Sequence, residues 1–159
     1  MPEMLRRFRA GLPEPAGLAQ GAASREELVN RFVAALASAD RAALVRLNMT
    51  RAEFAYLYFP NSRDAAMPNG MPPSLRWDLI SLNSEKGINR AIDRVGNRRL
   101  TLESLDCRKP PLNTGALTMY DGCTVRLLLP DGKSFDGPLF GSIMSYGGRF
   151  KFVGYANDM

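Results

Sequence analysis

The sequence predicts an α+β fold in which helices pack on a curved, mostly antiparallel sheet. Two observations support this prediction. Residues 120–156 have the pattern of three strands joined by tight turns at Pro130-Asp131-Gly132-Lys133 and Tyr146-Gly147-Gly148-Arg149. A long amphipathic helix, 75–95, and one further strand precede them. A sheet of this kind commonly encloses a pocket, and we expect any function to lie there.

The chain length of 159 residues indicates a single domain. Residues 3–9 are predicted to form a short helix, and the Pro-, Gly- and Ala-rich residues 11–23 a flexible connector. We therefore assign residues 1–23 to an N-terminal segment and residues 24–159 to the domain itself.

Capping residues predict where the first helices begin. Ser24 and Glu27 form a capping box, in which the serine accepts from a backbone N–H three residues on and the glutamate reaches back. Apolar side chains at four-residue spacing then predict an amphipathic helix over 25–37. Asp40 is predicted to cap a second helix that continues through Leu47.

A second capping box, at Thr50 and Glu53, begins the aromatic segment 54–59, which we expect Pro60 to end. The segment is aromatic and apolar on all sides, which favours a buried helix. The alternative is an exposed apolar surface that binds a partner or a second copy of the chain.

The longest predicted helix follows a proline-rich stretch, 60–73, which we expect to be an irregular loop. Ser74 is predicted to cap this helix, and Gly96 takes the position of a helix-terminating glycine. Gly87 is unfavourable inside a helix, so it predicts the close approach of a neighbouring segment.

Alternating apolar and polar residues predict four strands, and glycines within them predict bends that curl the sheet. The predicted strands are 99–107, 119–129, 134–146 and 149–156. The glycines are Gly137, Gly141 and Gly154.

This order of elements resembles the nuclear transport factor 2-like superfamily, a cone-shaped (cystatin-like) α+β fold. The resemblance covers about residues 24–157 and is carried by Leu28 to Leu47, Ser74 to Val95 and the strands through Tyr155. It implies three N-terminal helices on a curved sheet of about four strands, with a cavity between the long helix and the concave face. The chain departs from the superfamily at 54–73, where that fold often has a short hairpin.

The segment from Leu139 to Phe152 also resembles the closing hairpin of bacterial members of that superfamily, which are often exported. The superfamily includes dehydratases, isomerases, binding modules and dimerisation domains. The resemblance therefore implies a fold and not a reaction.

The chain is basic, with a net charge of +5 and a sequence pI of 9.6. Its cations are scattered among 16 acidic residues, apart from a cluster at 6–9 and another at 90–99. The second cluster ends a predicted helix, where cations complement the helix dipole. Apart from the single Phe8, these clusters lack the interleaved aromatic residues of a nucleic-acid surface, so no nucleic-acid partner is predicted.

The chain contains no histidine. This absence excludes histidine general bases, Ser-His and Cys-His nucleophile pairs, and the common zinc sites. Two lone cysteines without histidine also make a poor metal site, so we predict no metal. We expect no cofactor either.

No apolar run approaches the about 18 residues that span a membrane. The basic start of the chain is not followed by the apolar segment of a secretory signal. Two interpretations stay open: an exported or periplasmic protein whose signal was removed, and a cytoplasmic protein.

Cys107 and Cys123 lie near the end of one predicted strand and the start of the next. If those strands pair, the two thiols approach bonding distance, and we expect a disulfide. Two buried free thiols are the alternative. A disulfide would favour the exported interpretation.

Polar and aromatic side chains that the predicted cavity could contain are the candidate site residues. The pocket candidates are Tyr58, Trp77, Asn83, Arg126 and Tyr146. Asp78 beside the ring of Trp77, with a tyrosine donor such as Tyr56, would suit proton abstraction next to a carbonyl.

From these patterns we expect a module that binds a small apolar or amphipathic molecule or associates with protein, including a second copy of the chain, without catalysis. The alternative is a histidine-independent lyase or isomerase that uses an Asp/Tyr pair in the cavity. An open pocket in which Asp78 faces a tyrosine would favour the enzyme.

Overall fold

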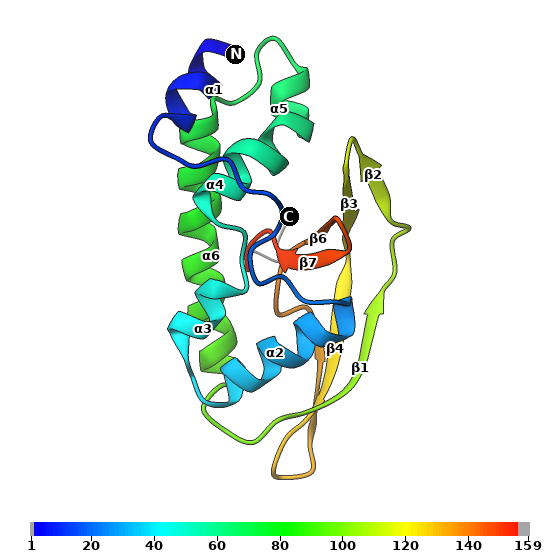
Figure 1. Ribbon diagram of the computed structural model, residues 1–159. Helices are drawn as coiled ribbons and strands as arrows, with labels where there is room; N and C mark the ends of the chain where they lie inside the picture. The colour runs from blue at the N-terminus through cyan, green and yellow to red at the C-terminus, as the bar shows by residue number, and fades with distance from the viewer. Residues whose placement is uncertain (1, 156–159) are drawn as a thin grey trace.

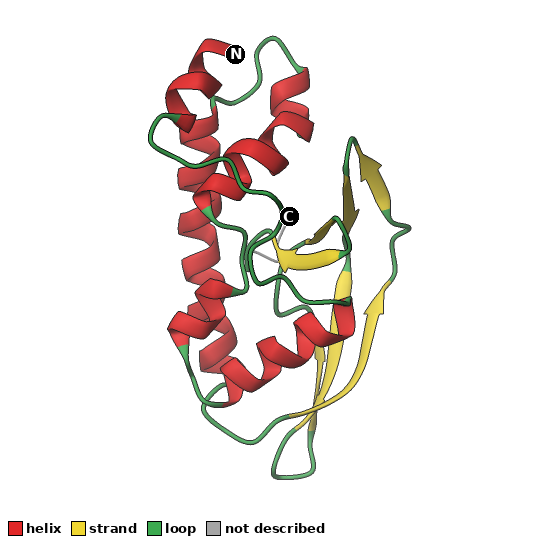
Figure 2. Ribbon diagram, viewed as in Figure 1, coloured by secondary structure: helices red, strands yellow, loops and turns green. Residues whose placement is uncertain are grey.

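The long helix α6 (Pro73–Val95) lies along one side of the molecule, and the strands lie on the other (Figure 1). The computed structural model describes residues 2–155. Within them the fold is α+β, with helices in one layer and two antiparallel sheets facing them (Figure 2).

The other helical elements come before α6 in the chain, as the sequence predicts. They are α1 (Pro2–Arg9), α2 (Arg25–Ala37), α3 (Arg41–Arg46), α4 (Arg51–Glu53), the π-helix η1 (Phe54–Tyr58), the 3-10 helix η2 (Phe59–Asn61) and α5 (Arg63–Ala66).

In residues 2–155, seven strands form the two sheets, with strand orders β1-β4-β5 and β2-β3-β6-β7. The strands are β1 (Thr101–Cys107), β2 (Leu112–Thr114), β3 (Leu117–Tyr120), β4 (Cys123–Leu128), β5 (Ser134–Gly137), β6 (Ile143–Tyr146) and β7 (Arg149–Phe152).

The prediction of one sheet with four strands is wrong, because two of the predicted strands divide. The stretch 119–129 breaks between β3 and β4 at Asp121 and Gly122, and 134–146 breaks between β5 and β6. Gly122 has φ +66°, a conformation that favours glycine. Since β3 pairs with β6 and β4 with β5, both strands pass from one sheet to the other. The predicted bends therefore separate two sheets.

Both predicted turns are confirmed. In the β4–β5 hairpin, the backbone N–H of Leu129 donates to the carbonyl of Lys133, and the N–H of Gly132 donates to the carbonyl of Leu129. In the β6–β7 hairpin, Gly147 and Gly148 have φ of +57° and +78°, the positive pair that a two-residue hairpin loop requires.

The predicted helix starts are confirmed in part. Oγ of Ser24 accepts from the backbone N–H of Glu27 at 3.0 Å, but the Glu27 carboxylate accepts from Ala23 at 2.7 Å and not from Ser24. This backbone N–H, with Arg31, lowers the pKa of Glu27. The capping box of Thr50 and Glu53 is complete in both directions.

Four local predictions are corrected. Ser74 does not cap α6, because the helix begins at Pro73 and proline has the φ that a first helical residue needs. Gly96 does not have the positive φ of a helix-terminating glycine, because its backbone is extended, with φ −72°. The residue with positive φ after α6 is Asn97, at +56°. Pro60 does not end the aromatic helix, since it lies inside η2; the predicted loop that follows contains α5.

The core consists of two clusters of buried side chains. The larger one joins α2 and α6 to both sheets, and its centre is Phe32, whose ring lies 5.4 to 5.6 Å from those of Phe140, Phe152 and Tyr155. The second cluster surrounds Phe54, which is fully buried, so the prediction of a buried aromatic segment is confirmed.

The N-terminal segment contributes to this second cluster through the buried side chains of Phe8 and Leu18. Farther along, Ala22 exchanges two backbone hydrogen bonds of 2.9 Å with Phe150 of β7. Met49 donates to the carbonyl of Phe152, and Phe152 donates to that of Leu47. Residues of β7 are thus bonded to two segments far away in the sequence.

Candidate functional site

A cavity of about 670 Å³ lies between the segment containing α3 and α4, the middle of α6, and β7. Its volume is in the range of small-molecule sites, about 300–1,000 Å³. The wall is mainly apolar. The apolar side chains that line it are Val45, Met49, Trp77, Ile80, Ile88 and Val153.

The pairing of β7 with residues 47–49 positions the polar part of this cavity. Asn48 forms a parallel bridge with Phe152, which brings it close to Lys151. Both side chains line the cavity, together with Ser84 from α6. Local sequence gives no signal for this group, because its members come from three separate parts of the chain.

The Asn48 side chain has an unused acceptor. Its Nδ2 donates to Oγ of Ser84 at 3.1 Å, and the same Oγ accepts from the backbone N–H of Tyr155 at 3.2 Å. Oδ1 of Asn48 is buried and has no hydrogen-bond partner among residues 2–155. Buried polar atoms are nearly always paired, so this oxygen is a position where a bound molecule could donate.

Lys151 is the second polar group that the sequence did not single out. Its Nζ lies 2.9 Å from Oε1 of Glu53, and the two side chains are 4% and 1% exposed. The Glu53 carboxylate also accepts from the backbone N–H groups of Thr50 and Ala19, at 2.8 and 2.6 Å. Glu53 is thereby satisfied, whereas the ion pair takes one of the three donors of Lys151.

Charged residues surround the mouth of the cavity. Arg41 and Arg46 of α3, Arg51 of α4 and Glu85 of α6 all line it and are exposed. The Arg51 guanidinium lies over the ring of Phe8, 4.3 Å from its centre. Such a cation–π contact orients the guanidinium without neutralising its charge.

A second cavity, of about 560 Å³, is more polar and lies beside β3 and the helical segment η1 to α5. The Nε of Arg76 lies 2.6 Å from Oδ2 of Asp64, and this hydrogen bond lowers the pKa of Asp64. Burial raises the pKa of Tyr58, which lines the same cavity. Oγ of Ser142 donates to Oδ1 of Asp121, and both residues also line this cavity.

The five predicted pocket residues do not line one common cavity. Trp77 lines the first cavity and Tyr58 the second. Both rings pack on Phe54, with centres 5.1 and 5.8 Å from it. Neither cavity is lined by Asn83, Arg126 or Tyr146. Asn83 is half-buried, and Arg126 is exposed, where it forms an ion pair with Glu103 at 3.4 Å. Tyr146 packs against the second core cluster, around Phe54.

Asp78 and Tyr56 lie outside both cavities. Asp78 is exposed on α6. The hydroxyl of Tyr56 donates to the carbonyl of Leu12 at 3.1 Å, and the Arg9 guanidinium lies over its ring at 4.5 Å. The geometry thus shows Tyr56 holding the N-terminal segment in place.

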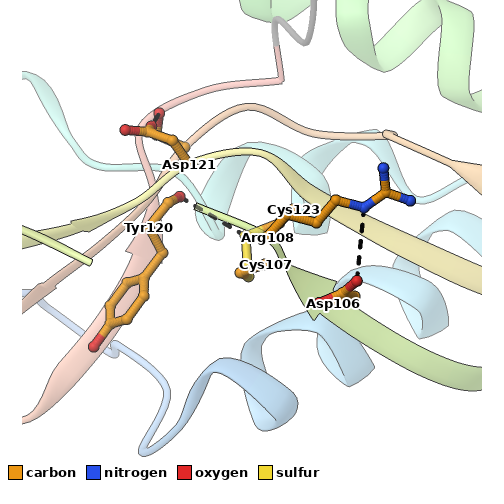
Figure 3. Close-up of a disulfide and its surroundings, with 7 residues drawn as sticks. Asp106, Cys107, Arg108, Tyr120, Asp121 and Cys123 are labelled. Atoms are coloured by element: carbon orange, nitrogen blue, oxygen red, sulfur yellow. Dashed lines mark hydrogen bonds and ion pairs between the residues drawn. A yellow bond between two sulfur atoms is a disulfide. The ribbon is translucent and has the colours of Figure 1, made fainter. Parts of the chain in front are cut away.

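Cys107 and Cys123 form a disulfide, with an S–S distance of 2.10 Å. Figure 3 shows the bond between the end of β1 and the start of β4, next to Tyr120 and Asp121. The two cysteines are direct partners in the β1–β4 ladder, as the predicted strand pairing requires.

None of the helices described is both long and apolar enough to cross a membrane. Within residues 2–155, no three side chains of His, Cys, Asp or Glu gather as metal ligands would. Comparisons of the chain with protein-family models, curated proteins and solved structures found no match.

Proposed function

We propose that this protein binds a small amphipathic molecule in the 670 Å³ cavity, without catalysing a reaction. The observation that carries the proposal is the combination of an apolar wall with the unpaired, buried Oδ1 of Asn48. Binding sites for small molecules have this composition: mostly apolar surface with a few polar groups that fix orientation.

The free energy of desolvation supports the same conclusion. A buried polar atom without a partner costs about 1–3 kcal/mol. A ligand whose hydroxyl or amide group donates to Oδ1 of Asn48 would recover part of this cost. Its apolar body would cover Trp77, Ile80 and Val153, at about 25 cal/mol per Å² of apolar surface removed from water.

The alternative of a lyase or isomerase lacks a comparable observation. It requires a carboxylate facing a tyrosine inside one cavity. Asp78 is exposed and Tyr56 is hydrogen-bonded to Leu12, so these two residues give that alternative no support.

Two further parts of the proposal concern fold family and location. The succession of helices followed by an antiparallel meander supports membership of the nuclear transport factor 2-like superfamily and a cone-like form. The Cys107–Cys123 disulfide supports an exported or periplasmic location, because disulfides persist in oxidising compartments.

Trp77 provides a direct test, since it is the single tryptophan of the chain and lines the cavity. The neutral dye Nile red should brighten on binding and change the Trp77 emission. Ser81→Phe places a ring at the cavity lining and should abolish both signals. Asn89→Phe, an exposed α6 position that lines neither cavity, is the matched control and should bind as the wild type does. Equal binding by both variants would contradict the proposal.

A further inference from the structure

We propose that the ligand of this cavity is an amphipathic anion, with its charged head group at Arg41, Arg46 and Arg51 and its apolar body inside. This inference rests on the proposed function and adds the chemical class of the ligand. It follows from the distribution of charge around the cavity.

The mouth of the cavity carries an excess of positive charge. Three arginines line it against one acid, Glu85. None of the three has an ion-pair partner in the described part of the chain. By contrast, Arg31 pairs with Glu27 and Arg76 with Asp64, both at 2.6 Å.

The interior of the cavity carries no net charge. Among the described residues that line the cavity, Lys151 is the one buried cation, and Glu53 neutralises it at 2.9 Å. Asn48 offers a neutral acceptor. The unneutralised positive charge is therefore confined to the entrance. An anionic head group would be attracted to the entrance and not to the buried interior of the cavity.

The three arginines are suited to hold such a head group. Guanidinium groups bind carboxylates and phosphates through two parallel N–H donors. Arg51 is held over Phe8 at 4.3 Å, so part of its conformational freedom is already lost before a ligand binds. Arg41 and Arg46 belong to α3 and Arg51 to α4, and all three line the cavity together with residues of α6.

The experiment compares three molecules with the same ten-carbon chain as competitors of Nile red: decanoate, decanol and decyltrimethylammonium. At low ionic strength, decanoate should compete about tenfold more strongly than decanol, and the cation least strongly. The preference for decanoate should shrink at about 0.5 M salt, because exposed charges are screened.

Two triple variants test whether the preference for decanoate over decanol comes from the arginines at the mouth of the cavity. Arg41→Gln/Arg46→Gln/Arg51→Gln should compete with decanoate and decanol equally. Arg90→Gln/Arg94→Gln/Arg99→Gln removes the same charge from exposed positions that line neither cavity, and should keep the preference. All six residues are exposed, so both variants should fold.

Equal competition by decanoate and decanol in the wild type would overturn this inference and leave the proposed function standing. A preference that survives in the Arg41/Arg46/Arg51 variant would also overturn it. Failure of Nile red to bind the cavity at all would instead overturn the proposed function, so the two failures are distinguishable.

Discussion

Nζ of Lys151 lies 2.9 Å from Oε1 of Glu53, and this ion pair joins the last strand to the short helix α4 inside the protein. The residues are 98 positions apart in the sequence. With the backbone N–H groups of Ala19 and Thr50, the pair connects three segments around one carboxylate.

We expect Lys151→Met to lower the free energy of unfolding by about 3–5 kcal/mol, because it leaves the Glu53 carboxylate buried without its cation. Urea unfolding measures the loss. Adding Glu53→Gln should recover part of it, since no buried charge then remains. Lys133→Met, at an exposed lysine, is the control. A loss below about 1 kcal/mol for Lys151→Met would contradict the prediction.

Replacing both cysteines, Cys107→Ser/Cys123→Ser, should lower the free energy of unfolding by about 3 kcal/mol. The disulfide joins residues 16 positions apart and restricts the unfolded chain. Reductant should lower the urea midpoint of the wild type to that of the double variant and leave the variant unchanged. Two reactive thiols in the unreduced, denatured wild type would show that the bond does not form.

Gly87→Ala should destabilise the protein, although alanine normally stabilises an α-helix relative to glycine. A Cβ at Gly87 would lie 2.1 Å from the carbonyl oxygen of Tyr155, so the backbone would have to move. We expect a loss of about 1–3 kcal/mol, measured by thermal unfolding. Asn89→Ala, exposed on the same helix, should change stability by less than about 0.5 kcal/mol. A higher melting temperature for Gly87→Ala would refute the close packing.

Asp64 should contribute to stability in a way that depends on pH. The hydrogen bond from Arg76 lowers the pKa of Asp64 in the folded protein. The carboxylate therefore stabilises the fold above its unfolded pKa of about 3.9, and this contribution is lost as the pH falls through the folded pKa.

The corresponding variant is Asp64→Asn, compared with the wild type by urea unfolding. At about pH 6 the variant should be about 1 kcal/mol less stable. Toward about pH 3 the difference should narrow, because the wild-type carboxylate begins to take up a proton. A difference that stays constant over this range would mean that the Arg76–Asp64 contact adds no pH-dependent stability.

Local patterns predicted most helices and both hairpin turns, since capping boxes, apolar spacing and paired glycines act within a few residues. The division into two sheets was not predictable in this way. Glycines indicated bends, but the sheet to which each half-strand belongs depends on pairings such as β3 with β6, between segments far apart in the chain.

The candidate site was predicted less well than the fold. Trp77 was a candidate because it is an aromatic residue of the predicted long helix, and it lines the first cavity. Lys151 lies between Phe150 and Phe152, and such alternation predicts a lysine that faces water. It is buried because Glu53 covers that face of β7, a contact that neither residue indicates alone.

Backbone hydrogen bonds to β7 from Ala22, Leu47 and Met49 affect the association of this protein with other molecules. They occupy the N–H and C=O groups of Phe150 and Phe152 that would otherwise form an open sheet edge. An open edge recruits strands from other chains and leads to aggregation. The N-terminal segment and the turn after α3 therefore protect this end of the sheet from its neighbours. β2, at the other end of the same sheet, has no strand beyond it among residues 2–155.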